Sequence, residues 1–259
     1  MKLEDELFCL QFELEAMANL VIHNRAERWV YKYMFNDIEQ EHLARYKFAI
    51  GFTSGKEVLD VACGSGYGSY LLATEGNAAK VQGFDLDESA IRYGNYRYGH
   101  PNVNRAVKNV LELSPELKFD VVVSFETIEH IPDYRLFLKK MKVALKSDGI
   151  LMISTPIVES TSTKCTNPHH VIEWSFNDFK ELVSEYFIIK DTYVQSVEMK
   201  TDNPRTTLLQ KILRRLLGNK NPKIKERPVF EKFCNQYKIE DIKSGYQVLV
   251  CVPKTNFAK

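Results

Sequence analysis

An acidic residue and two glycines follow one another closely after a short apolar run. Residues 57–61 have the pattern of a buried strand that contains Asp60, and Gly64 and Gly66 follow before a helix-like stretch at 67–76. Glycines at such positions let the backbone approach a ligand closely, and the start of a helix presents unpaired N–H groups. The segment is therefore a candidate ligand-binding turn.

The charge at this turn selects among ligands. Two like charges about 5 Å apart repel by roughly 3 kcal/mol at an effective dielectric near 20, so Asp60 disfavours a diphosphate and favours a cation. A dinucleotide-binding loop would have a third glycine where this chain has Ser69. Asp85 ends the next predicted strand, where a carboxylate can accept hydrogen bonds from both hydroxyls of a ribose. An ammonium near Asp60 and a ribose on Asp85 describe S-adenosylmethionine; the alternative is that both are only turn and cap residues.

On these residues the chain resembles the class I S-adenosylmethionine-dependent methyltransferases, over about residues 38–195 and the last strand. The resemblance implies a doubly wound, Rossmann-like α/β fold with seven mainly parallel strands in the order 3-2-1-4-5-7-6. The last strand would be antiparallel, Leu86 would pack on the adenine, and Asn109 and Val110 would lie beside the edge of the adenine. The cofactor-binding residues expected together are Tyr46, Asp60, Ala62, Gly64, Ser65, Gly66, Asp85, Leu86, Asn109, Val110 and Phe125.

The segment before and through the turn is similar to a narrower group of enzymes. Residues 41–69 resemble methyltransferases found among genes for capsule, O-antigen and other glycan synthesis. Glu41, His42, Arg45 and Tyr46 would lie on adjoining turns of a leader helix that closes over the methionine end of the cofactor. The other interpretation is a solvated helix face with one packed tyrosine.

Acidic and imidazole side chains follow two later strands. The predicted strand 119–125 leads directly to Glu126, Glu129 and His130, which would share one face if they formed a helical turn. His170 follows the fifth predicted strand and so returns to the same end of the sheet. These residues are therefore candidates for the chemistry at the methyl acceptor.

Three interpretations of these residues stay open. The pair E-x-x-E-H and H-x-x-E-W resembles metal-dependent methyltransferases that act on the terminal 2'-hydroxyl of small RNAs. In that case Glu126, Glu129, His130 and His170 would hold a divalent ion such as magnesium or manganese. In the second interpretation His130 or His170 is a metal-free general base. In the third, the carboxylates complement a helix dipole and the histidines bond the loop backbone.

Strand and helix patterns alternate through most of the chain, which builds a parallel sheet with helices on both faces. Pro132 is expected in the first turn of one helix, and Ser175 with Asp178 resembles a capping box that opens another. The predicted strands are 57–61, 80–85, 103–107, 119–125, 149–155, 187–194 and 246–252, and the predicted helices are 67–76, 87–99, 133–149 and 176–187.

The composition is that of a globular chain with local rather than global charge. Its 259 residues include 35 basic and 34 acidic side chains, a balance that argues against an extended basic surface for nucleic acid. The five cysteines are scattered without a C-x-x-C pair, so neither a disulfide framework nor a thiolate zinc site is indicated. An acidic amino terminus and the lack of a long apolar run predict a cytoplasmic protein.

One segment departs from this neutral balance. Residues 200–227 hold nine basic and two acidic side chains, and residues 208–217 have an apolar stripe opposite three of the cations. It could be a lid that attracts an anionic acceptor, a helix that rests on an anionic membrane, or a helix packed on the domain or on a second subunit of a homodimer. The expected organisation is a helical leader or lid at 1–50, a cofactor-binding core at 51–199, a basic amphipathic insertion or lid at 200–240 and the final strand of the sheet at 241–259.

The resemblance implies a methyltransferase that modifies a hydroxyl of a sugar or nucleotide sugar in glycan biosynthesis, with an anionic small-molecule or glycan acceptor. The alternatives are 2'-O-methylation of an RNA 3' end, which the near-neutral charge disfavours, and methylation of an amine or phosphoramidate of a small molecule. A sensor that binds the cofactor without transferring the methyl group is a further alternative.

Overall fold

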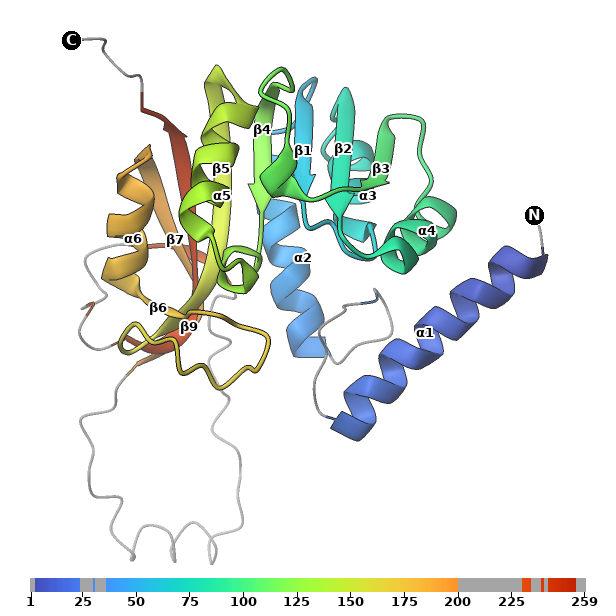
Figure 1. Ribbon diagram of the computed structural model, residues 1–259, viewed down its shortest axis with the longest axis horizontal. Coiled ribbons are helices and arrows are strands. Elements are labelled where there is room, and N and C mark those ends of the chain that lie inside the picture. Colours follow the sequence, from blue (N-terminus) through green and yellow to red (C-terminus); the bar gives the residue numbers. More distant parts are fainter. Residues whose placement is uncertain are drawn as a thin grey trace, which may run out of the picture.

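One mixed sheet runs through the part of the chain that the computed structural model describes, which is residues 3–23, 30, 36–199, 230–233, 239 and 242–254. Helices cover both of its faces (Figure 1). The strands are β1 (Glu57–Val61), β2 (Lys80–Asp85), β3 (Val103–Val107), β4 (Phe119–Ser124), β5 (Leu145–Val158), β6 (Trp174–Ser175), β7 (Phe187–Met199), β8 (Glu231–Lys232) and β9 (Ile242–Pro253). The α-helices are α1 (Leu3–His23), α2 (Asn36–Ile50), α3 (Tyr67–Thr74), α4 (Glu88–Arg97), α5 (Tyr134–Ala144) and α6 (Phe176–Ser184), with short 3₁₀ helices η1 (Val110–Glu112) and η2 (Ile128–His130).

The strand order confirms the expected topology. The sheet runs β3-β2-β1-β4-β5-β9-β7-β8, with β1 parallel to both β2 and β4. Strand β9 is inserted between β5 and β7 and is antiparallel to both. When β7 and β9 are counted as the sixth and seventh long strands, the order is 3-2-1-4-5-7-6. The carboxyl ends of β1, β2, β4 and β5 therefore lie at one edge of the sheet, where ligand sites of such folds form.

Alternating side chains of the central strands build two separate cores. Val58 and Val121 pack with residues of α2 and α3 on one face of the sheet. Leu59 and Val122, each one position further along, pack with residues of α5 and α6 on the other face. Because successive side chains of a strand point to opposite faces, strands buried on both sides read as continuous apolar runs. This explains why β1 and β4 were recognisable from their sequences.

Several predicted boundaries are wrong. Helix α5 begins at Tyr134 because Asp133 caps it, accepting a hydrogen bond from the backbone N–H of Leu136 at 2.9 Å. Pro132 therefore precedes the cap instead of lying in the first turn. The helix ends at Ala144, and residues 145–149, expected in the helix, form the start of β5 instead.

The chain after β4 also differs from the expectation. Strand β4 ends at Ser124, so Phe125 lies outside it. Glu126 adopts a left-handed backbone conformation with φ of 50°, and the 3₁₀ helix η2 follows. The predicted helical turn through residues 126–130 is therefore wrong.

The capping expectation at the start of α6 is correct, because the hydroxyl of Ser175 accepts a hydrogen bond from the N–H of Asp178.

Other expectations concern the leader, the insertion and the cysteines. Helices α1 and α2 form the expected helical leader, whereas residues 200–229 of the insertion lie outside the described residues. Among the described residues no helix has the length and apolarity needed to cross a membrane. The four cysteines in the described part of the chain carry free thiols.

Candidate active site

The turn after β1 is built by three residues with positive φ. Ala62, Gly64 and Gly66 have φ of 53°, 51° and 85°, a region that only glycine adopts without strain. A Cβ added at Gly64 would meet nothing within 4 Å, so open space lies beside the backbone there. Ala62 is exposed and Ser65 is buried. The turn thus presents bare backbone on the side where a ligand was expected.

Arg105, which sequence analysis did not identify, stabilises this turn by packing against Gly66. The residue is 5% exposed, and its guanidinium donates hydrogen bonds to the carbonyls of Gly66 at 2.7 Å, Gly94 at 3.1 Å and Tyr98 at 3.1 Å. A Cβ at Gly66 would lie 2.6 Å from its Nε atom, so this glycine is needed for the close approach of the arginine. The only available signal was a lone charged residue within the short predicted strand 103–107.

Asp60 lies fully buried beneath the turn. Its Oδ1 accepts a hydrogen bond from the hydroxyl of Tyr46 at 3.0 Å, and its Oδ2 accepts one from the hydroxyl of Ser69 at 2.6 Å. Burial raises the pKa of Asp60 to about 6, although both hydrogen bonds favour the ionised form. Ser69, which replaces the third glycine of a dinucleotide-binding loop, is thus a partner of the acid.

Tyr46 reaches Asp60 from α2, on the leader. Its ring packs edge-on against Tyr67 at 5.2 Å and Phe125 at 5.3 Å between centroids. A Cβ at Gly68 would lie 2.1 Å from the Tyr46 ring, so the tyrosine fits only because residue 68 has no side chain. Two of the residues expected to bind the cofactor, Tyr46 and Phe125, therefore form an aromatic wall next to Asp60.

Asp85 is held in place by backbone groups at the end of β2. Its Oδ2 accepts a hydrogen bond from the N–H of Gly64 at 2.8 Å, and its Oδ1 accepts one from the N–H of Asp87 at 2.9 Å. Each carboxylate oxygen retains a further lone pair for a hydroxyl. The next residue, Leu86, is 70% exposed. An oriented carboxylate beside an exposed apolar side chain fits a ribose and an adenine.

Asn109 and Val110 lie at the start of η1. The side-chain oxygen of Asn109 accepts a hydrogen bond from the N–H of Leu111 at 3.0 Å, so it caps the short helix. Val110 is half-buried against the core. Their predicted contact with the edge of the adenine remains a prediction. Taken together, the open backbone at Gly64, the fixed Asp85 and the exposed Leu86 fit S-adenosylmethionine.

The second group of candidate residues meets at the carboxyl ends of β4 and β5. The N–H of Val171 donates to the carbonyl of Glu129 at 2.8 Å, which ties the loop after β5 to η2. The imidazoles of His130 and His170 lie 4.8 Å apart between centroids, at 83° to each other. Ligand atoms of Glu129, His130 and His170 lie within 4.8 Å of one another. The prediction that these three residues meet is confirmed.

The partners of the two histidines define where their protons are. His130 Nδ1 lies 3.1 Å from the carbonyl oxygen of His169, which can only accept, so Nδ1 carries the proton. His170 Nδ1 lies 2.7 Å from Glu173 Oε1, and its Nε2 lies 3.0 Å from the side-chain amide nitrogen of Asn167. With the amide donating to Nε2, the neutral imidazole of His170 carries its proton on Nδ1, and its Nε2 accepts from Asn167. A base or a metal ligand requires this tautomer, with the Asn167 amide displaced from Nε2.

Glu126 does not join this group. Its carboxylate accepts a hydrogen bond from the hydroxyl of Ser154 at 2.5 Å, and the Ser154 hydroxyl oxygen lies 3.1 Å from the N–H of Glu126. The expected set of four metal ligands is therefore reduced to three. The physical reason is the left-handed conformation of Glu126, which directs its side chain differently from a residue in a helical turn.

Glu129, like Asp60, has no exposed surface. Its Oε2 accepts a hydrogen bond from the hydroxyl of Thr155 at 3.2 Å, and its Oε1 has no hydrogen-bond partner among the described residues. Burial, followed by the nearby charge of Glu126, raises the pKa of Glu129 well above its ordinary value. An unpartnered carboxylate oxygen of this kind suits a cation or a donor that is bound only with a ligand.

A buried polar layer lies next to these acids. Arg45, from α2, is 1% exposed, donates to Gln195 Oε1 at 2.5 Å and lies 4.9 Å from the centroid of the Tyr246 ring. Gln247 pairs with Thr155 across β9 and β5, and neither side-chain polar atom of Gln247 has a partner in the described residues. The leader therefore closes over this end through a buried arginine, which rules out the alternative of a solvated helix face at that position.

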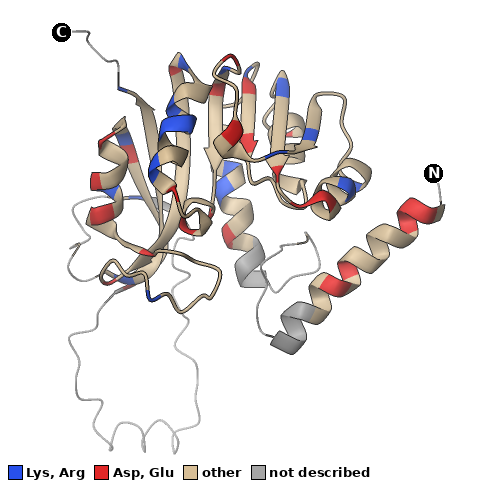
Figure 2. Cartoon of the chain, viewed as in Figure 1, with Lys and Arg blue, Asp and Glu red and all other residues tan. Residues whose placement is uncertain are grey.

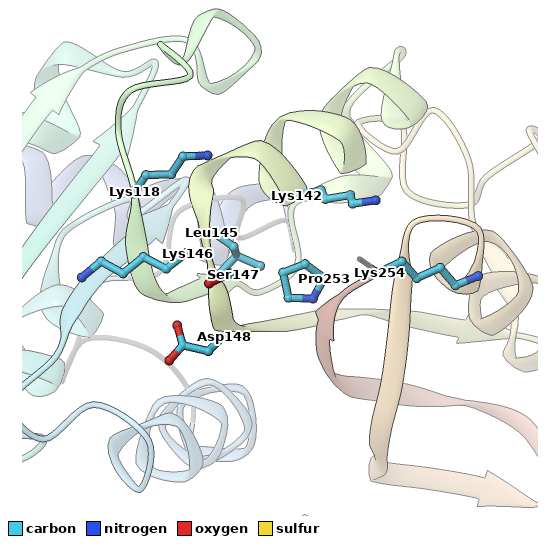
Figure 3. A pocket seen from close by; sticks show the side chains of 8 residues that line it. All are labelled: Lys118, Lys142, Leu145, Lys146, Ser147, Asp148, Pro253 and Lys254. Carbon is cyan, nitrogen blue, oxygen red and sulfur yellow. The ribbon is translucent and has the colours of Figure 1, made fainter. Parts of the chain in front are cut away.

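The hollow shown in Figure 3 lies at the opposite edge of the sheet. Its lining includes residues 145–148 at the start of β5 and Pro253 at the end of β9. Lys118, Lys142 and Lys254 also line it, and Lys146 is paired with Glu57 and Asp120 at 2.9 and 3.1 Å. Because β9 is antiparallel, its end lies with the amino ends of the parallel strands. The hollow is therefore separate from the candidate site.

Comparison with known proteins agrees with this arrangement. The profile of the family described as "Methyltransferase domain" matches residues 52–217, more than half of the chain. A probable S-adenosylmethionine-dependent methyltransferase of Mycolicibacterium smegmatis is 35% identical over 144 residues, which are 54% of this chain and 54% of that protein. A ubiquinone biosynthesis O-methyltransferase of Bradyrhizobium diazoefficiens is 33% identical over 103 residues, 39% of this chain and 40% of that protein. The chain spans about half the length, or less, of these curated relatives.

A solved structure shares the fold. The N-methyltransferase NodS from Bradyrhizobium japonicum WM9, in complex with S-adenosyl-L-homocysteine, matches with a TM-score of 0.58 and 12% sequence identity. The match covers 95% of this chain and 99% of that one. At this identity the likeness concerns the fold alone.

Proposed function

This chain belongs to the methyltransferase domain family, and from that premise we propose that it methylates a hydroxyl of a sugar or nucleotide sugar in a glycan pathway. S-adenosylmethionine supplies the methyl group as a reactive sulfonium. The residues around the glycine turn position this cofactor: Asp85 orients the ribose, Leu86 supports the adenine and Asp60 favours the positively charged methionine end.

We choose a hydroxyl as the acceptor because of the hydrogen-bond partners of the His130 and His170 imidazoles. A hydroxyl is far from acidic at neutral pH, so its attack on a methyl group needs a group that removes its proton, whereas a neutral amine needs none. Both histidines have Nδ1 engaged by an acceptor, which assigns the basic lone pair of the neutral imidazole to Nε2. In His170 this nitrogen is bonded to the side-chain amide of Asn167, which an acceptor hydroxyl would replace. Glu173 holds His170 in the required tautomer and would stabilise the imidazolium that forms.

The choice of a sugar rests on two supports. The first is the resemblance of residues 41–69 to enzymes of glycan synthesis. The second is the polar layer, in which buried atoms of Arg45 and Gln247 are unpartnered donors, and Gln247 Oε1 and Glu129 Oε1 are unpartnered acceptors. A ligand with several adjacent hydroxyls can satisfy donors and acceptors together, because each hydroxyl does both.

A divalent ion is a second candidate component, and the donor set favours it. Glu129 and the two histidines would hold magnesium or manganese, which would lower the pKa of the acceptor hydroxyl. The pairing of His170 with Glu173 is the usual support of a metal-binding imidazole. Calorimetry of manganese binding, without any acceptor, tests this. We expect Glu129→Gln to lose the heat of binding and the control variant Glu112→Gln to keep it. Equal heats in all three proteins would exclude the ion.

The free thiols of the described cysteines suit a reducing compartment, and we place the protein in the cytoplasm.

The decisive experiment incubates the purified chain with S-adenosylmethionine and separate pools of nucleotide sugars, glycan fragments, amines and RNA. Mass spectrometry should find one added methyl group on an oxygen of a sugar, together with S-adenosylhomocysteine. Methylation only of RNA or of a nitrogen would replace the proposed acceptor, and cofactor binding without any product would identify a sensor.

A further inference from the structure

Tyr246 lies on β9, at the same end of the sheet as the candidate acceptor residues. It pairs with Pro156 of β5 on one side and with Gln195 of β7 on the other. Ser154, which bonds the carboxylate of Glu126, lies two residues before Pro156. Because side chains two positions apart in a strand point to the same face, Tyr246 and Ser154 share a face of the sheet. Tyr246 therefore lies one two-residue step beyond Ser154, toward the carboxyl end of β5.

The ring of Tyr246 is held by α2 through a buried polar network. Arg45 Cζ lies 4.9 Å from the ring centroid, and Arg45 donates a hydrogen bond to Gln195 Oε1 at 2.5 Å. The amide nitrogen of Gln195 donates in turn to the backbone carbonyl of Glu41 at 2.8 Å. A guanidinium over an aromatic face is attracted by the quadrupole of the ring. The position of the ring is therefore defined by residues of the chain itself.

The hydroxyl of Tyr246, in contrast, has no hydrogen-bond partner among the described residues. The residue is half-buried. Burial, followed by the nearby charges of Glu126 and Glu41, raises the pKa of Tyr246, so the hydroxyl keeps its proton. Tyrosine hydroxyls in such surroundings usually have a partner. This one is a donor that is available to a ligand.

Hydrogen-bond acceptors without partners lie around the same hydroxyl. The charges of Glu126, Glu41 and Glu129 all act on Tyr246. Acidic and basic residues both occur along the described part of α2 (Figure 2), yet Glu41 forms no ion pair with a described side chain. Glu129 Oε1 also has no partner in the described part of the chain. A free donor among free acceptors suits a ligand with adjacent hydroxyls, because each hydroxyl both donates and accepts.

We propose that Tyr246 binds the methyl acceptor, with its hydroxyl donating a hydrogen bond to an oxygen next to the hydroxyl that is methylated. This rests on the proposed function, because it takes the acceptor to be a sugar with adjacent hydroxyls. It gives the last strand of the sheet, β9, a role in recognising the acceptor. Such a hydrogen bond is made before and during methyl transfer, so its loss weakens acceptor binding and leaves the chemical step unchanged.

A purely structural tyrosine would need only its ring, which covers Arg45. Tyr193 of β7 is a suitable comparison, because it lies on the same face of the sheet, opposite Val248 of β9. It is also half-buried, its ring packs on Phe48 at 4.5 Å between centroids, and its hydroxyl has no partner among the described residues. Tyr193 lies two residues further than Gln195 from the carboxyl end of β7, and so further from the candidate acceptor residues.

The test compares Tyr246→Phe, which removes only the hydroxyl, with Tyr193→Phe as the matched control. The full chain is given S-adenosylmethionine and a dilution series of the sugar pool that mass spectrometry identifies as methylated, and formation of S-adenosylhomocysteine is followed. The concentration for half-maximal rate should rise about three- to tenfold in Tyr246→Phe, with the maximal rate within about twofold of the wild type. The dissociation constant for S-adenosylhomocysteine and the unfolding midpoint should not change. Tyr193→Phe should match the wild type throughout.

The outcomes separate this proposal from the proposed function. If the wild type methylates no sugar, the proposed function fails and the role of Tyr246 fails with it. If the wild type methylates a sugar and Tyr246→Phe has the same half-saturating concentration, only the role of Tyr246 is rejected. A weaker binding of S-adenosylhomocysteine or a lower unfolding midpoint in Tyr246→Phe would also overturn the proposal, because the hydroxyl would then support the fold or the cofactor.

Discussion

The hydroxyl of Tyr46 lies 3.0 Å from Oδ1 of Asp60, and this contact joins the leader helix to the floor of the glycine turn. The tyrosine approaches so closely that residue 68 must be glycine. Position 68, which sequence reasoning did not assign to the site, therefore controls the placement of two residues expected at the cofactor.

Gly68→Ala should displace the Tyr46 ring, because the added Cβ would lie 2.1 Å from it. We expect a loss of about 1 to 3 kcal/mol in the free energy of unfolding and at least about a tenfold weaker binding of S-adenosylhomocysteine. Denaturant titration and calorimetry measure the two effects. Gly51→Ala is the matched control, since its Cβ would make an ordinary contact at 3.5 Å; equal behaviour of the two variants would refute the argument.

Cofactor binding should depend on pH through Asp60. Its pKa is raised to about 6 by burial, so the carboxyl group is increasingly neutral below that pH and no longer attracts the positively charged end of the cofactor. Affinity should therefore rise as pH increases from 5 to 7, by about tenfold. Asp60→Asn should bind weakly and without this dependence, whereas Asp120→Asn, at the other edge of the sheet, should keep the wild-type profile. An unchanged profile in Asp60→Asn would show that another group titrates.

Leu86 is exposed at the place predicted for the adenine. Leu86→Ser removes apolar surface that the ligand would cover, so the dissociation constant for S-adenosylhomocysteine should increase about tenfold, with no loss in the free energy of unfolding. Val143→Ser, an equally drastic change at an exposed apolar site far from the turn, should leave binding unaffected. Calorimetry of the two variants decides whether Leu86 contacts the ligand.

Removal of the imidazoles should separate catalysis from cofactor binding. His170→Ala or His130→Ala should lower turnover by about two to four orders of magnitude while S-adenosylhomocysteine binds normally. Glu173→Gln keeps the shape of the partner of His170 but removes its charge, and should lower turnover less and shift the pH profile of the rate. Near-normal turnover in both histidine variants would reject a hydroxyl acceptor activated by these residues.

Arg105 should be a structural residue of the turn. Arg105→Met leaves the carbonyls of Gly66, Gly94 and Tyr98 without this donor, at a cost of about 3 kcal/mol in the free energy of unfolding. Arg92→Met, which breaks an exposed ion pair, should cost no more than about 1 kcal/mol. Chemical denaturation of both variants compares the two costs, and similar values would mean that the turn does not depend on Arg105.

The sequence by itself determined the elements and the cofactor end of the sheet. Buried strands, the glycine turn and helical spacing are local patterns, so β1, the turn and α3 were readable without knowledge of the fold. Asp60 and Asp85 could be assigned for the same reason, because each ends or nearly ends a strand and the parallel sheet brings those ends together. The convergence of Glu129, His130 and His170 followed from the same topological rule.

The tertiary structure decided everything that depends on pairs distant in the sequence or on one backbone angle. Arg45 and Gln195 meet across 150 positions, and Arg105 reaches Gly66 across 39, so no local pattern marks them. The left-handed conformation of Glu126 removed it from the expected ligand set, and the cap at Asp133 moved the start of α5. Local propensity specifies which segments become strands and helices, whereas side-chain partners are selected only when those segments pack.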